Sequence, residues 1–136
     1  PNLLNLASIN SIASKNISYV GDAISYATIV SNVGNVPLGT YDVPVTVFTE
    51  LSPSVSFIPG SLSINNVPVN CVNPSQINLG ILQPGDVRII TYSVRVNNAC
   101  PNIVYNIQKL LYGYDPLYIG TSTFSVNGNI VMTYIN

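Results

Sequence analysis

The chain has 136 residues, of which 47% are hydrophobic and only 7% are charged, and its formal net charge is −1. This length suits one domain with one core, and the apolar content excludes a chain that is disordered by composition. There is no basic patch to support nucleic-acid binding, and no apolar run approaches the roughly 18 residues of a membrane span. Because ordinary soluble domains are about 25% charged, the deficit favours self-association; an extracellular surface bathed in salt or covered by glycans is the alternative.

The first fourteen residues have only a weak pattern, and their Asn and Ser content fits an extended arm better than a helix. In a β-rich chain such an arm pairs with its own sheet or with the open edge of a neighbouring copy. We therefore treat residues 1–14 as an N-terminal arm or first strand and residues 15–136 as a single β-sandwich domain. The start at Pro1 fits either removal of a leader or loss of an initiator Met. Asn16 opens the one glycosylation sequon, which is a weak signal.

Alternating polar and apolar side chains predict a strand at residues 23–32, and the break in alternation at Thr28-Ile29 predicts a bulge there. The next strand is predicted at residues 42–49. Its Pro44 cannot donate to a ladder, so this strand should lie at a sheet edge or carry a bulge.

Two Pro-Gly pairs, Pro59-Gly60 and Pro84-Gly85, punctuate the middle of the chain. Each pair should separate two short strands, and the strands around the second pair should form a hairpin across residues 83–86. The predicted strands are residues 55–58, 61–66, 76–82 and 87–97.

Residues 103–112 fit a helical period, but their Tyr and β-branched content and the all-β context favour a strand. Residues 121–127 and 129–135 flank Asn127-Gly128 and predict a closing strand pair or a single strand with a kink. The result is an all-β fold of about eight to ten short antiparallel strands, which is typical of a β-sandwich.

The chemistry of catalytic and metal sites is missing from the sequence. The chain has no His, and its five acidic residues are scattered, so no catalytic, cofactor-binding or metal-binding residues are predicted and no enzyme is expected. Cys71 and Cys100 fit an internal disulfide, two separate thiols or bonds to neighbouring subunits. The nine tyrosines cluster towards the C-terminal end, where they suit contacts with partners or glycans, or packing in the core.

Several motifs follow one another along most of the chain. They are Gly21-Asp22, Ile24-Ser25-Tyr26, Ser31-Asn32-Val33-Gly34-Asn35-Val36, Val55-Ser56-Phe57-Ile58-Pro59-Gly60-Ser61, Asn66-Val67-Pro68-Val69, Ile77-Asn78-Leu79-Gly80, Gln83-Pro84-Gly85 and Asn129 to Asn136. In order and spacing they resemble a bacterial repeat, the conserved domain of unknown function eleven, which occurs in tandem in long surface proteins. This resemblance implies an immunoglobulin-like β-sandwich on a cell or spore surface.

The chain departs from that repeat at three points. Thr49-Glu50-Leu51-Ser52 stands where the repeat has Asp-x-Leu-Pro, and the usual Lys of the first strand has no equivalent. A Lys–Asn isopeptide bond is therefore not expected. Cys71 and Cys100 are not hallmarks of the repeat and would provide a covalent tie in its place.

By analogy with tandem repeats that join tail to head, we expect a structural subunit that polymerises with copies of itself. The product would be an extracellular or spore-surface filament, joined by strand exchange through the N-terminal arm, with an anchoring surface protein as a further partner. The alternative is a surface-displayed adhesive module that uses the Tyr-rich loops. Intersubunit contacts are expected at the first and last strands, through Leu3, Leu4, Leu6, Ile9, Tyr134 and Ile135.

Overall fold

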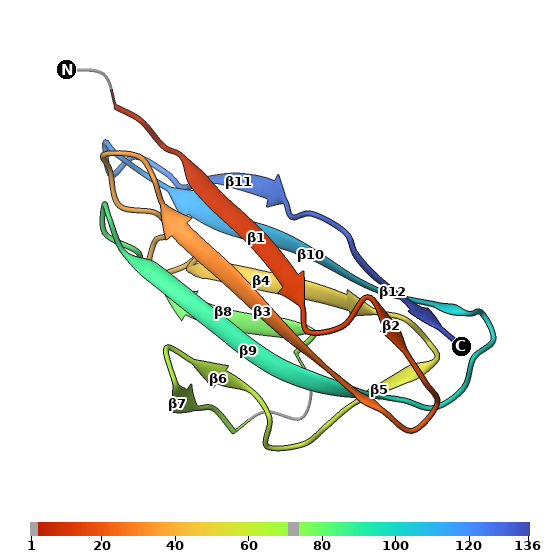
Figure 1. Cartoon of the computed structure of the whole chain (residues 1–136). Coiled ribbons are helices and arrows are strands. Elements are labelled where there is room, and N and C mark those ends of the chain that lie inside the picture. Colours follow the sequence, from red (N-terminus) through yellow and green to blue (C-terminus); the bar gives the residue numbers. More distant parts are fainter. Residues whose placement is uncertain (1–2, 71–73) are drawn as a thin grey trace.

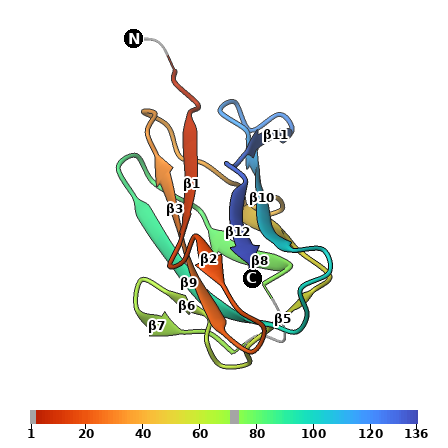
Figure 2. The same ribbon diagram turned by 45° about the vertical axis from the view of Figure 1, so that its right-hand side comes forward.

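The computed structural model describes residues 3–70 and 74–136, and Figures 1 and 2 show the chain from two sides. Every regular element within these residues is a strand, and no helix is present among them. Three of the strands are only two residues long, so their number exceeds the eight to ten expected. The strands are β1 (Ala7–Ala13), β2 (Ile17–Ser18), β3 (Ala23–Asn32), β4 (Val45–Leu51), β5 (Val55–Phe57), β6 (Ser63–Ile64), β7 (Val67–Pro68), β8 (Gln76–Gly80), β9 (Val87–Val96), β10 (Ile103–Tyr114), β11 (Ser122–Asn127) and β12 (Val131–Ile135).

The strands form two sheets. The first has the order β1-β3-β9-β6-β7, with β5 also paired to β9, and the second has the order β2-β12-β10-β4-β8, with β11 also paired to β10. Among the described residues every strand pair is antiparallel except that of β2 with β12. The predicted all-β class is therefore confirmed, and the two-sheet arrangement is consistent with a β-sandwich.

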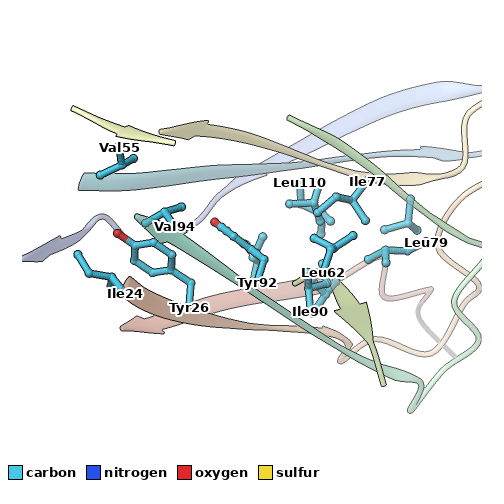
Figure 3. Packing of buried hydrophobic residues seen from close by; sticks show 14 of the residues in the cluster. Ile24, Tyr26, Val55, Leu62, Ile77, Leu79, Ile90, Tyr92, Val94 and Leu110 are labelled. Carbon is cyan, nitrogen blue, oxygen red and sulfur yellow. The ribbon is translucent and has the colours of Figure 1, made fainter. Parts of the chain in front are cut away.

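Alternate side chains of the long strands fill the space between the sheets, as Figure 3 shows for ten labelled residues. Tyr26 on β3 and Tyr92 on β9 stand opposite each other in the ladder, with ring centroids 5.5 Å apart. The Tyr92 hydroxyl donates to the side-chain oxygen of Asn106 on β10, so this contact joins the two sheets through the core.

Strand β3 has the predicted bounds, but the bulge predicted at Thr28-Ile29 is wrong. Its register with β1 and β9 runs without a break. Thr28 is buried because its hydroxyl hydrogen-bonds within the core, so a polar residue continues the inward-facing series. For β4 the edge-strand alternative is wrong, since β4 lies between β8 and β10, and the bulge alternative is confirmed by a register shift between Val45 and Thr46.

One predicted pairing and one predicted strand in the middle of the chain differ from the structure. Residues 83–86 do form a turn, in which Asp86 N donates to Gln83 O at 2.9 Å, but this turn joins β8 in one sheet to β9 in the other. The single strand predicted at residues 61–66 is instead the start of a hairpin, β6 with β7, whose corner at Asn65 and Asn66 has φ values of 50° and 66°. Asn tolerates this left-handed conformation better than most residues.

The C-terminal segment follows the second of its two predicted alternatives. Strands β11 and β12 lie one after the other along the same side of β10, so together they act as one interrupted strand and not as a hairpin. Gly128 sits at the interruption, where its amide donates to Gln108 O at 2.8 Å. The prediction of a strand rather than a helix at residues 103–112 is confirmed, as β10.

We predict that the fold loses stability in alkali through its buried tyrosines. Burial raises the pKa of Tyr26 from 10.0 to about 12, and burial together with the neighbouring Tyr26 raises the pKa of Tyr92 further. The folded state then holds these protons more tightly than the unfolded state. The stabilisation is complete below pH 10 and is lost as the pH rises towards 12, by about 1.4 kcal/mol per pH unit and per tyrosine.

Urea unfolding between pH 9 and pH 11.5 measures how the free energy of unfolding falls with pH. Tyr26→Phe should remove the part of this fall that one tyrosine contributes. An identical pH dependence in the two proteins would contradict the assignment of this titration to Tyr26.

Candidate functional site

The two ends of the chain lie at opposite ends of the molecule (Figure 1). We call the end that carries residues 3–6 and the loops 33–44, 81–86 and 114–121 the N-terminal pole. The C-terminal pole carries the loops 14–22, 52–54 and 97–102, together with Asn136. Strands β3, β9 and β10 run the distance between the poles, and β1 starts at the N-terminal pole.

The N-terminal arm is exposed at the first of these poles but is held by main-chain contacts. Leu3, Leu4 and Leu6 are exposed large apolar residues. Asn35 N donates to Leu4 O at 3.0 Å, and Leu4 N donates to Asn35 Oδ1 at 2.6 Å. The arm passes so close to Gly34 that a Cβ there would lie 1.9 Å from Leu4 O.

The other residues expected at intersubunit contacts divide into two groups. Tyr134 is exposed near the C-terminal pole, whereas Ile9 and Ile135 are only 8% and 4% exposed and belong to the chain's own core. Ile9 is buried because β1 pairs with β3 of the same chain over its whole length. Only Leu3, Leu4, Leu6 and Tyr134 therefore stand free to meet a neighbour in this state of the chain.

A polar seam joins β1 and β3 of the first sheet to β10 of the second, and no pattern in the sequence indicates it. Ser11 Oγ on β1 and Thr28 Oγ1 on β3 both donate to Gln108 Oε1 on β10, at 2.5 and 2.6 Å. On the outer side of β1, Ser11 N donates to Asn129 Oδ1 at 2.7 Å and Asn129 Nδ2 donates to Ser11 O at 2.9 Å. The Asn129 amide thus acts as a strand partner for β1 at the interruption between β11 and β12.

One of the two cysteines, Cys100, lies in the part of the chain that the structure describes, and no disulfide is present among those residues. Cys100 is exposed, with a free thiol. Cys71 lies outside the described residues, so the internal and the intersubunit disulfide both stay predictions.

A groove of about 610 Å³ opens at the N-terminal pole. Its most exposed side chains are Tyr41, at 99%, and Tyr118, at 93%. Its lining residues come from the arm and from three loops: Leu3, Val36, Pro37, Gly39, Thr40, Tyr41, Asp42, Ile81, Gln83, Tyr114, Asp115, Pro116, Tyr118 and Thr121. The sequence showed the Tyr-rich segment at 105–118, but it did not show that Tyr41 lies near it.

Asp42 ties the two aromatic loops of the groove together. It accepts hydrogen bonds from Thr40 Oγ1 at 2.8 Å and from Thr121 Oγ1 at 3.2 Å. The Thr40 hydroxyl, with help from backbone amides and the Thr121 hydroxyl, holds the pKa of Asp42 below its ordinary value, so this carboxylate is charged at neutral pH.

No group of three or more His, Cys, Asp or Glu residues gathers into a metal-binding cluster in residues 3–70 and 74–136. Over the same ranges there is no helix long and apolar enough to cross a membrane. The features that remain are surfaces: the apolar poles, the seam at β1 and the groove.

Comparison with known proteins adds no family assignment. No family model matches the chain, and no curated protein matches it. The similarity to the bacterial surface repeat therefore stays a prediction that rests on its motifs.

We predict that Asn129→Ala destabilises the fold by about 1–3 kcal/mol, because it leaves both main-chain groups of Ser11 without their partner. Urea unfolding measures the loss, and amide hydrogen exchange at Ser11 should accelerate. The matched control is Asn127→Ala, an exposed position of the same segment, which should change stability by less than about 0.5 kcal/mol. Equal effects of the two substitutions would show that the Asn129 clamp contributes nothing to stability.

Proposed function

We propose that this chain is a non-enzymatic structural subunit of an extracellular fibre on a cell or spore surface, and that it assembles head to tail with copies of itself. The observation that carries the proposal is the position of the two termini at opposite poles, with exposed apolar residues at each (Figure 1). A contact between two different surfaces of identical subunits can be repeated from copy to copy. It forms a ring if the rotation between copies closes and a fibre if it does not.

The exposed apolar residues are suited to such an interface. The N-terminal pole offers Leu3, Leu4 and Leu6, and the C-terminal pole offers Ile17, Tyr19, Val20 and Tyr134. Apolar groups of this size gain about 1.5–3 kcal/mol each when they are fully buried. Few charges surround them, since only nine residues of the chain are Lys, Arg, Asp or Glu.

Charge also favours contact between unlike poles. Asp42, Asp86 and Asp115 lie in loops of the N-terminal pole, and Arg88 at the start of β9 pairs with Asp86. In the loops of the C-terminal pole the charges of Lys15 and Asp22 cancel. Two N-terminal poles would therefore repel each other, whereas a head-to-tail contact sets the acidic pole against a pole without net charge.

Strand exchange is the form of assembly that we propose for the arm. Strand β1 buries only two side chains deeply, Ile9 and Ser11, and it is held otherwise by its ladder with β3 and by Asn129. A β1 donated by a neighbouring copy would make the same contacts, so exchange costs little beyond the hinge. An immunoglobulin-like connection of the two sheets, as in the repeat that the chain resembles, fits this proposal.

Leu3→Asp combined with Leu6→Asp should weaken self-association at least about tenfold, because it places charge where apolar contact is proposed. Sedimentation velocity at increasing protein concentration, with electron microscopy of the pellet, measures the change. Val67→Asp is the matched control, since Val67 on β7 is as exposed as Leu3 (64% against 62%) but lies away from both poles. A wild-type protein that stays monomeric at every concentration would overturn the proposal.

A designed disulfide separates strand exchange from simple end-to-end contact. Ser8 on β1 stands opposite Ser31 on β3, so Cys at both positions can bond across the ladder. With both native cysteines replaced by Ser, oxidation of assembled Ser8→Cys/Ser31→Cys protein should give a ladder of covalent oligomers on a non-reducing gel. Ser31→Cys alone should give dimers at most. Covalent monomers from fully assembled protein would rule out exchange and leave end-to-end contact.

A further inference from the structure

The groove at the N-terminal pole displays two tyrosine rings almost completely to solvent. Tyr41 and Tyr118 come from different loops, yet both line the same hollow. Tyr118 also has a φ of 55°, which is an uncommon and costly conformation for a bulky residue. An exposed ring in a strained backbone gains nothing for the fold, and such combinations cluster at binding sites.

The loops that carry these rings are held in place before any ligand arrives. Asp115 Oδ1 accepts from the amides of Ile119 and Gly120, which fixes the turn behind Tyr118. Where the loops meet at Gly113, a Cβ would lie 2.6 Å from Thr121 Cγ2 and 2.7 Å from Thr40 Oγ1, so the approach is as close as glycine allows. A preorganised site spends less of its binding free energy on ordering its own loops.

The polar groups of the groove define the charge of its ligand. The lining includes the carboxylates Asp42 and Asp115 and the amide of Gln83, and it includes no Lys or Arg. The lining also includes Tyr114, whose hydroxyl is buried and has no hydrogen-bond partner among the described residues. Anionic ligands would be repelled, whereas ligands rich in neutral hydroxyl donors would find acceptors.

We propose that this groove binds a neutral oligosaccharide. The faces of a pyranose ring carry C–H groups, which are attracted to the negative face of an aromatic ring, and its hydroxyls donate to carboxylate and amide oxygens. Tyr41 and Tyr118 supply the stacking faces, and Asp42, Asp115 and Gln83 supply the acceptors. The volume of about 610 Å³ lies within the range of roughly 300–1,000 Å³ for small-ligand sites and accommodates a short oligosaccharide.

Saccharide binding goes beyond the proposed structural role and does not depend on it, because the stacking rings and the acceptors of the groove all lie on loops outside the exchanged arm. The two are nevertheless linked by position. If the N-terminal pole meets the next copy in a fibre, the groove stays open only on the terminal subunit, where saccharide binding would make the fibre end adhesive.

Saturation-transfer NMR and titration calorimetry on the full chain test the proposal. The probes are maltotriose, cellotriose and triacetylchitotriose, with trigalacturonic acid as the anionic comparator. At least one neutral probe should bind, and the anionic probe should not. Tyr41→Ala and Tyr118→Ala should each weaken that binding about tenfold or more, because each removes a stacking face.

Val67→Ala is the matched control, because Val67 is exposed on β7, lies outside the groove and belongs to neither proposed fibre contact. It should leave binding unchanged, and all three variants should unfold at the wild-type temperature since their side chains are exposed. Absence of binding to every neutral probe at millimolar concentration overturns the proposal. So does binding that survives both groove substitutions. Groove variants that alter the sedimentation coefficient without altering saccharide binding would identify the groove as a self-association surface instead.

Discussion

The fold depends on the polar seam that ties β1, the edge strand of the first sheet, to β10 of the second. One acceptor, Gln108 Oε1, takes hydrogen bonds from Ser11 and Thr28, which stand on adjacent strands of the opposite sheet. This contact specifies the register of β1 in its ladder with β3, since a shift by one residue would turn Ser11 outwards and bury a neighbour in its place. Asn129 closes the far side of the same strand. A β1 strand from a neighbouring copy could make the same hydrogen bonds as the chain's own β1. Exchange of β1 between copies is therefore compatible with the fold.

Local chemistry was sufficient to locate most strands but not to choose their partners. The alternation at residues 23–32 gave the bounds of β3 correctly, and the β-branched content of residues 103–112 correctly favoured a strand. The turn at residues 83–86 formed as its Pro-Gly predicted, yet a tight turn serves equally well between two strands of one sheet and between two sheets. That choice depends on which side chains pack across the core, and these come from distant parts of the sequence.

Two polar residues beside β1 play roles that local patterns do not indicate. The interrupted alternation at Thr28 predicts a bulge, and Asn129 is expected only as the first residue of a strand. In the structure buried Thr28 and exposed Asn129 are both hydrogen-bond partners of β1. The residues expected at intersubunit contacts are apolar, but not all of them are exposed. Ile9 and Ile135 lie on strands whose alternation turns them into the core. Leu3, Leu4 and Leu6 precede β1 and remain exposed. The groove could not be foreseen, because the loops of Tyr41 and Tyr118 are far apart in the sequence and approach each other where Gly113 has no side chain.

The scarcity of charge gives the poles and the groove a common physical basis. A surface with few charges has a low desolvation cost, so it can be covered by another copy or by an uncharged ligand without stranding a buried ion. The carboxylates of the N-terminal pole repel negative charge. They therefore disfavour contact with a second N-terminal pole and binding of an anionic saccharide. Both proposed occupants therefore compete for one pole, and in a head-to-tail fibre the number of open grooves is set by the number of fibre ends and not by fibre length. As a fibre grows, the open saccharide groove would then stay at its end, and no further open grooves would form along its length.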